Sequence, residues 1–166
     1  MIIVIPRETL AGENRVALIP DSVKKLVRVG ATIKIESGAG VGSGYDDTAY
    51  TEAGAVIAGN RQTMLAEGDI VLRIHKPPMD EIPLYKEGAI SISYLDPFNE
   101  RALVEAMATR KLSAVSMEMI PRSTRSQKMD ALSSQGNLAG YVMVMKAAAA
   151  LDRILPMMMT PAGTLK

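Results

Sequence analysis

Short apolar runs alternate with helical patterns along most of the chain, and this alternation limits the possible folds more than any other feature. The apolar runs predict strands at residues 1–5, 31–37, 69–74, 89–95 and 112–118. Helical or turn patterns separate them at residues 20–30, 46–54, 60–68, 79–88 and 99–111, with Asn99 as the expected cap of the last. This order predicts an open, mostly parallel α/β sheet of the Rossmann or flavodoxin type, with helices on both faces.

A long helix is predicted near the C-terminus, from about residue 130 to residue 155. Gly136 and Gly140 are four residues apart, and Ala139 and the alanines at 147–150 are also small, so another helix can approach closely. The long helix therefore either packs within its own chain or crosses to a second domain or a partner subunit. If the three methionines at residues 157–159 are ordered, we expect another protein surface to cover them, because an exposed apolar patch usually marks an interface. The expected division of the chain is an α/β subdomain (1–130), a long connecting helix (131–155) and a tail (156–166).

Composition excludes several kinds of site. The 166 residues carry a net charge of +1, which argues against a nucleic-acid binder and its usual basic excess. The chain has no cysteine and a single histidine, His75, which excludes disulfides, thiolate metal sites and histidine-cluster metal sites. No apolar run reaches the roughly 20 residues that cross a bilayer, so we expect a soluble chain in a reducing cytosol.

Three weaker candidate sites precede the long helix. Residues 38–44 contain four glycines, but none falls at the third position of the dinucleotide fingerprint, so the segment is a flexible turn or an anion nest. Arg15 either binds a carboxylate substrate or pairs with Glu8 or Glu13. His75 follows a predicted strand, where the ligand crevice of an open α/β sheet lies, although a solvated loop position explains it as well.

The strongest candidate site is the stretch from Pro121 to Gln135, between a predicted buried strand at residues 112–120 and the long helix. Asp130 is expected to cap this helix through its carboxylate, with Ser133 and Ser134 in the first turn.

A capping role explains why an aspartate stands at position 130. It does not explain the presence of Arg122, Arg125 and Gln127. Guanidinium groups donate to carbonyl oxygens, a glutamine amide both donates and accepts, and a carboxylate accepts from an amide or a hydroxyl. These residue types are therefore consistent with a polar planar ligand held at the start of the long helix.

Several segments resemble a known pair of families. IPRE, ENRVALIP and VKKLVRVGATIKIESGAGVGSGYDD resemble the N-terminal half shared by alanine dehydrogenases and the NAD(H)-binding domain of proton-translocating NAD(P) transhydrogenase. MEMIPRSTRSQKMDALSSQGNLAGY and PMMMTPAGT resemble the transhydrogenase side specifically. The resemblance covers essentially the whole chain.

The resemblance implies that the polar stretch is a loop that grips the nicotinamide end of NAD(H). By position, Arg122 would bond the carboxamide, while Asp130 and Ser133 would support the nicotinamide ribose and the carboxamide. Gln127 would reach toward the NADP(H) carried by a neighbouring domain. Arg125 lies inside the loop without an assigned role, and no catalytic acid, base or metal is implied.

Alanine dehydrogenases resemble the chain less well at their catalytic positions. They have a substrate-binding lysine before the proline of a Lys-Glu-Pro element and a histidine in a later strand, and these positions are His75 and Asp96 here. Neither residue suits pyruvate binding and imine chemistry, and Arg15 alone matches. An alanine dehydrogenase-like amino-acid oxidoreductase is therefore the less favoured alternative.

The implied function is hydride transfer between NAD(H) and NADP(H) coupled to proton translocation, with this chain as part of the NAD(H)-binding alpha subunit. In both families the TPAGT segment leads into a second, Rossmann-type domain, so we expect the chain alone to bind NAD(H) weakly and to be inactive.

The expected partners are a second copy in a homodimer and the NADP(H)-binding and membrane-spanning components. These components would place the chain in the cytoplasm, peripheral at the inner face of the plasma membrane. A non-catalytic dimerisation domain, built on the long helix and residues 157–159, is the other alternative.

Overall fold

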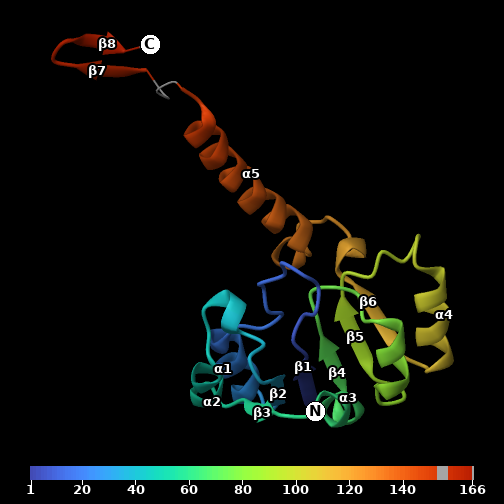
Figure 1. Cartoon of the computed structure of the whole chain (residues 1–166). Helices are drawn as coiled ribbons and strands as arrows, with labels where there is room; N and C mark the ends of the chain where they lie inside the picture. Colours follow the sequence, from blue (N-terminus) through green and yellow to red (C-terminus); the bar gives the residue numbers. More distant parts are fainter. Residues whose placement is uncertain (153–156, 166) are drawn as a thin grey trace. The chain divides into compact units, whose positions relative to one another are not determined.

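The computed structural model describes residues 1–152 and 157–165, which belong to two compact units, Met1–Pro121 and Arg122–Lys166 (Figure 1). The first unit holds a six-stranded sheet of parallel strands in the order β3-β2-β1-β4-β5-β6. This is the strand order of the Rossmann fold, which confirms the predicted α/β class. The strands are β1 (Ile2–Ile5), β2 (Thr32–Glu36), β3 (Val56–Ala58), β4 (Ile70–Leu72), β5 (Ile90–Ser93) and β6 (Ser113–Ser116).

The central strand β1 is buried on both faces of the sheet. The helices of this unit are α1 (Pro20–Arg28), α2 (Asp47–Glu52), α3 (Arg61–Glu67) and α4 (Arg101–Thr109). Ile3 and Ile5 share a core with Val23 of α1, whereas Val4 belongs to a different core with Met64 of α3. Because successive strand residues point to opposite faces, helices must cover both, as the sequence predicts.

Helix starts in the first unit depend on short polar side chains. Asp46 and Asn60 each accept the backbone N–H three residues later at 2.9 Å, and they cap α2 and α3. The expected cap of α4 is wrong. The Asn99 amide donates instead to Asp96 at 2.8 Å, and the N-cap position of α4 is Glu100.

The two edge strands differ from the sequence predictions. β3 is absent from the prediction, because its three residues are too few to show an alternating pattern. β6 is predicted to be buried, but Ser113, Ala114 and Val115 are exposed. The reason is the position of β6 at the edge of the sheet, where, among the described residues, it pairs with β5 alone.

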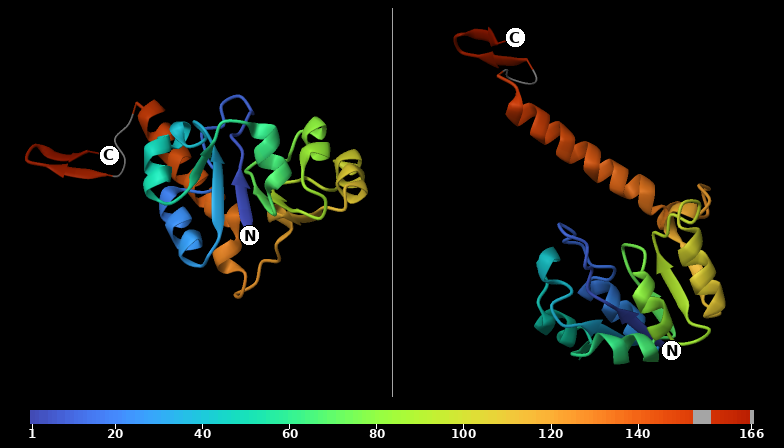
Figure 2. Two further views of the ribbon diagram at one scale, coloured as in Figure 1. Left: turned by 90° about the horizontal axis from the view of Figure 1, so that it is seen from below. Right: turned by 45° about the vertical axis from the view of Figure 1, so that its right-hand side comes forward.

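The second unit consists of a loop, a long helix and a hairpin. Its elements are the 3₁₀ helix η4 (Gln127–Met129), α5 (Ala131–Ala150) and the antiparallel strands β7 (Met158–Thr160) and β8 (Gly163–Leu165). α5 is one uninterrupted helix, drawn in orange (Figure 2). It ends earlier than predicted, because Leu151 has extended backbone; residues 153–155 of the predicted helix lie outside the described part of the chain. Among the described residues no helix, α5 included, is both long enough and apolar enough to cross a membrane.

Candidate functional site

The strand order of the sheet reverses between β1 and β4, and two hollows open beside the segments that follow these strands. In open α/β sheets, ligands bind outside the carboxyl ends of the strands at such a reversal. One hollow, of about 400 Å³, is lined by Glu8, His75 and Lys76 among others. The other, of about 280 Å³, includes Arg7, Glu8 and Arg15 in its lining. The first unit therefore has a crevice where the fold predicts one.

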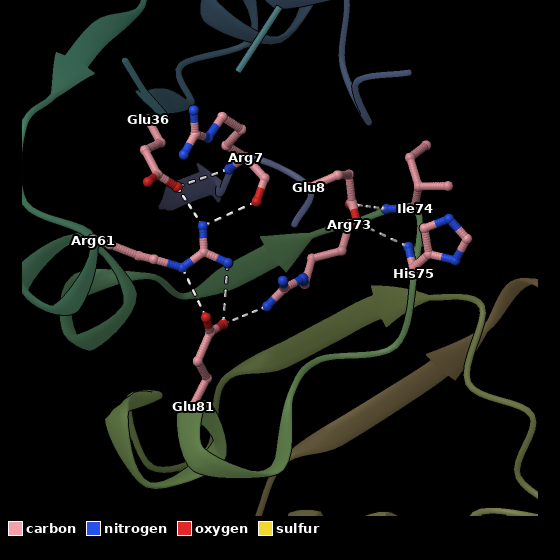
Figure 3. A network of polar contacts seen from close by, with 8 residues as sticks. All are labelled: Arg7, Glu8, Glu36, Arg61, Arg73, Ile74, His75 and Glu81. Carbon is pink, nitrogen blue, oxygen red and sulfur yellow. Dashed lines mark hydrogen bonds and ion pairs between the residues drawn. The ribbon is translucent and has the colours of Figure 1, made fainter. Parts of the chain in front are cut away.

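A network of ion pairs joins groups near the ends of β1, β2 and β4 (Figure 3). Arg73 follows β4, its side chain is only 1% exposed, and its guanidinium donates to Glu81 at 2.5 Å. Arg61 of α3 donates to the same carboxylate at 2.8 Å and also to Glu36 at the end of β2. Glu36 in turn accepts the backbone N–H of Arg7 at 2.8 Å.

The charges of this network balance one another. Burial tends to raise the pKa of Glu81, but the hydrogen bonds and charges of Arg61 and Arg73 outweigh it and hold that pKa below its ordinary value. Glu81 is therefore ionised at neutral pH and is shared by two cations. Because these groups have no spare charge to offer a ligand, we assign them to the frame of the crevice.

Glu13 contacts both Arg15 and His75. One Glu13 oxygen lies 2.6 Å from a guanidinium nitrogen of Arg15 and 2.7 Å from Nε2 of His75. The hydrogen bond from Arg15 is the largest cause that lowers the pKa of Glu13 to about 2. Of the two alternatives for Arg15, the structure shows an ion pair, and Glu13 is one of its partners.

Residues 38–44 form a packed turn. The Gly38 N–H donates to the Asp47 carboxylate at 2.8 Å, and the N–H groups of Ala39, Val41, Ser43 and Gly44 donate to backbone carbonyls. A Cβ atom at Gly40 would lie 2.4 Å from the ring of Tyr50, so the close approach of this ring requires glycine. An anion nest would need several of these N–H groups to be available, and the structure therefore favours the turn.

Asp130 caps α5 as predicted. Its carboxylate accepts the backbone N–H of Ser133 at 2.9 Å and the Ser133 hydroxyl at 2.6 Å. The Ser134 hydroxyl donates to the backbone carbonyl of Asp130 at 2.9 Å. The bonds from Ser133, helped by the charge of Arg122, lower the pKa of Asp130. The carboxylate is therefore ionised at neutral pH and is held in one position at the first turn of the helix.

Three further polar side chains of the loop are exposed to solvent. Arg122, Arg125 and Gln127 are exposed, and none of them forms a side-chain hydrogen bond or ion pair with any other residue in the described part of the chain. The loop backbone is nevertheless ordered by bonds of its own, since Ser126 N–H donates to the Ser123 carbonyl at 3.0 Å. The loop thus combines a hydrogen-bonded backbone with three exposed side chains that donate no hydrogen bond within the described part of the chain.

The structure brings some of the predicted site residues together. Asp130 and Ser133 are in direct contact, and Arg122 acts on Asp130 through its charge. Gln127 begins η4, three positions before the cap. Asp96 serves a turn instead of a site, because its carboxylate accepts the Asn99 amide. A cofactor contact for Arg122, Gln127, Asp130 or Ser133 stays a prediction.

Comparison with known proteins gives consistent matches. Residues 4–139 match the family described as alanine dehydrogenase/PNT, N-terminal domain. The chain is 46% identical over 169 residues to an NAD(P) transhydrogenase alpha subunit of Rhodospirillum rubrum, covering 99% of this chain and 44% of that protein. It is 36% identical over 150 residues to alanine dehydrogenase 2 of Staphylococcus aureus strain N315, and this match covers 90% of this chain and 40% of that protein.

A solved structure agrees with these sequence matches. The crystal structure of transhydrogenase from Sinorhizobium meliloti matches with a TM-score of 0.90 and 43% identity, covering 99% of this chain and 49% of that chain. The chain therefore spans less than half the length of the relatives it matches.

Proposed function

The chain belongs to the alanine dehydrogenase/PNT N-terminal domain family, and from this premise we propose that it is part of the NAD(H)-binding component of an NAD(P) transhydrogenase. The complete enzyme would transfer hydride between NAD(H) and NADP(H) and couple this transfer to proton translocation. The match to a transhydrogenase alpha subunit, at 46% identity over nearly the whole chain, supports this assignment.

The observation that carries the proposal is the combination of an exposed donor, Arg122, with the fixed acceptor Asp130 at the start of α5. A nicotinamide carboxamide offers one carbonyl acceptor and one NH₂ donor. The exposed Arg122 guanidinium would donate to the carbonyl, and the ionised Asp130 carboxylate and the Ser133 oxygen would accept from the NH₂ or from ribose hydroxyls. Gln127 would reach toward NADP(H) on the neighbouring domain. The donor set therefore fits this cofactor.

The residues of the loop would supply position rather than acid–base chemistry. Bound NAD(H) supplies the hydride, and direct hydride transfer between two nicotinamides needs no proton donor from the protein. Asp130 is held by two bonds from Ser133, so its carboxylate offers one fixed orientation to a ligand. Fixed orientation of this kind is what accelerates a transfer between two bound molecules.

The proposal extends to the organisation of the complete enzyme. Residues 1–130 would be the α/β subdomain, residues 131–155 the connecting helix, and residues 156–166 the segment that leads into a Rossmann domain for the rest of NAD(H). The partners would be a second copy of the chain, an NADP(H)-binding component and a membrane-spanning component. The chain would then work in the cytoplasm, at the inner face of the plasma membrane.

The alanine dehydrogenase alternative is disfavoured by the crevice. A carboxylate substrate would need the charge of Arg15, but Glu13 already neutralises it at 2.6 Å. His75 is turned toward the same carboxylate, and Asp96 accepts a bond within its own turn.

The dimerisation alternative is favoured by α5, on which Tyr141 and Met143 are 67% and 69% exposed. Analytical ultracentrifugation separates the alternatives. A tight dimer that does not respond to NADH would support a purely structural role, and a monomer that responds to NADH would exclude it.

The experiment that tests the proposal is a titration of the ¹⁵N-labelled chain with NADH, followed by amide chemical shifts. We expect shifts at residues 122–133, weak affinity, and no shifts at Arg61 or Arg73 in the ion-pair network. Reduced nicotinamide mononucleotide should reproduce the loop shifts, and AMP should not, because it lacks the nicotinamide. Shifts confined to the crevice around Arg15 would contradict the proposal. Micromolar affinity would contradict the idea that a second domain anchors the adenosine half.

A further inference from the structure

Glu118 joins the ends of two neighbouring strands. It lies in the 3₁₀ helix η3 (Met117–Met119), directly after β6. One of its oxygens accepts the backbone N–H of Leu95 at 2.9 Å and that of Asp96 at 2.5 Å. These two residues follow β5, which is the strand paired with β6. A single carboxylate oxygen therefore ties the turn after β5 to the segment after β6.

The turn that Glu118 binds has an unusual backbone. Asp96 has a φ of 51°, in the left-handed region that non-glycine residues seldom adopt. Its N–H points at Glu118 in this conformation. Burial tends to raise the pKa of Glu118, but the hydrogen bonds that its carboxylate accepts, those from the N–H groups of Leu95 and Asp96 among them, outweigh it and lower that pKa. Glu118 is thus ionised at neutral pH and makes charge-assisted bonds, which are stronger than neutral ones.

The segment around Glu118 is less buried than the central strands of the sheet. β6 is mostly exposed at the edge of the sheet, and Met119 is 48% exposed. Burial therefore contributes less here than in the central strands, and the hydrogen bonds of Glu118 contribute correspondingly more. Pro121, the last residue of the first unit, follows three positions later, and Arg122 begins the polar loop.

We propose that Glu118 is a positioning residue, whose carboxylate fixes the point from which the polar loop leaves the sheet. The role in cofactor binding rests on the proposed function of this loop. The positioning itself is a property of the first unit and can be measured without any ligand.

The test compares Glu118→Ala and Glu118→Gln with a matched control, Glu105→Ala, in the whole chain. Glu105 is an exposed glutamate of α4 whose partner is Arg101. In Glu118→Ala, amide hydrogen exchange at Leu95, Asp96 and Ile120 should accelerate about tenfold or more, because their anchor is removed. Glu118→Gln keeps an acceptor oxygen without the charge, so it should recover part of the protection. The control should match the wild type.

Amide hydrogen exchange in β1 distinguishes a local positioning role of Glu118 from a contribution to the stability of the whole fold. We expect β1 amides to exchange as in the wild type, whereas equal acceleration in β1 and at Ile120 would overturn the proposal. Unchanged exchange at Ile120 in Glu118→Ala would also overturn it. If Glu118→Ala does not fold, the same comparison is made with Glu118→Gln, for which wild-type exchange at Leu95, Asp96 and Ile120 would count against the charge-assisted anchor.

NADH provides a separate readout. The NADH concentration that half-saturates the loop shifts should rise about tenfold in Glu118→Ala, while the shifts at saturation stay the same. A wild-type chain that shows no loop shifts would refute the proposed function, and the exchange data would still decide the role of Glu118.

Discussion

The crevice of the first unit and the loop of the second unit use the same kinds of residue in opposite ways. In the crevice, Arg61 and Arg73 share Glu81, and Glu13 neutralises Arg15. In the loop, the side chains of Arg122 and Gln127 form no hydrogen bond or ion pair among the described residues. Charges that are paired within the protein stabilise a shape, whereas donors without partners are available to a ligand. The groups that form ion pairs beside the crevice are therefore committed to the protein, while the exposed Arg7 side chain, which also lines the crevice, forms no ion pair among the described residues.

The largest effect is expected from Glu81→Ala. This change leaves the nearly inaccessible Arg73 guanidinium without its carboxylate, and removing one partner of a buried pair costs about 3 kcal/mol or more. Urea denaturation measures the loss, with Glu105→Ala as the exposed control. NADH shifts in the loop should persist under native conditions. A loss below about 1 kcal/mol, the value typical of an exposed pair, would show that the network is not a structural frame.

Arg122→Ala should show the opposite behaviour. The free energy of unfolding should change by less than about 0.5 kcal/mol, as for surface positions in general. The affinity for NADH should fall at least about tenfold, because the donor to the carboxamide is lost. Lys128→Ala removes another exposed cation of the same loop and is the matched control. Equal losses in the two variants would mean that the loop attracts NADH by net charge alone.

A smaller effect should appear when the crevice is acidified. The pKa of Glu13 is lowered from 4.5 to about 2, chiefly by Arg15, so the folded state binds this proton more weakly than the unfolded state does. Its contribution is complete above the unfolded pKa and is lost as the pH falls toward about 2. We expect about 1 kcal/mol, since solvent screens a partly exposed pair.

Denaturation curves at several acidic pH values measure this loss, and Glu13→Gln should remove it. If Glu13→Gln shows the same acid-dependent loss as the wild type, the pair does not contribute.

The smallest effect is expected from Asp130→Asn. Asparagine caps a helix about as well as aspartate, so circular dichroism should show an unchanged helix content. NADH affinity should fall by less than about tenfold, because an acceptor oxygen remains while its charge is lost. Asp130→Ala should lower both quantities. Wild-type affinity in Asp130→Ala would show that this residue is a cap and nothing more.

Local features of the site were predictable, and distant pairings were not. Asp130 and Ser133 are three residues apart, so a capping pattern reveals their contact. Arg61 and Glu81 are 20 residues apart in different elements, and no spacing rule joins them. The sequence offered Glu8 and Glu13 as candidate partners of Arg15, and the ion pair with Glu13 became visible only in the folded structure.

The sequence by itself determined the order and type of the central elements, since the periods of apolar residues in β1, β2 and α1 are local properties. It also determined which side chains of the loop are strong donors. The tertiary structure decided which strands lie at the edge, because burial of β6 depends on its neighbours rather than on its own residues. It also decided which charges are already paired, and that distinction separates the ion-paired frame of the crevice from the exposed side chains of the loop.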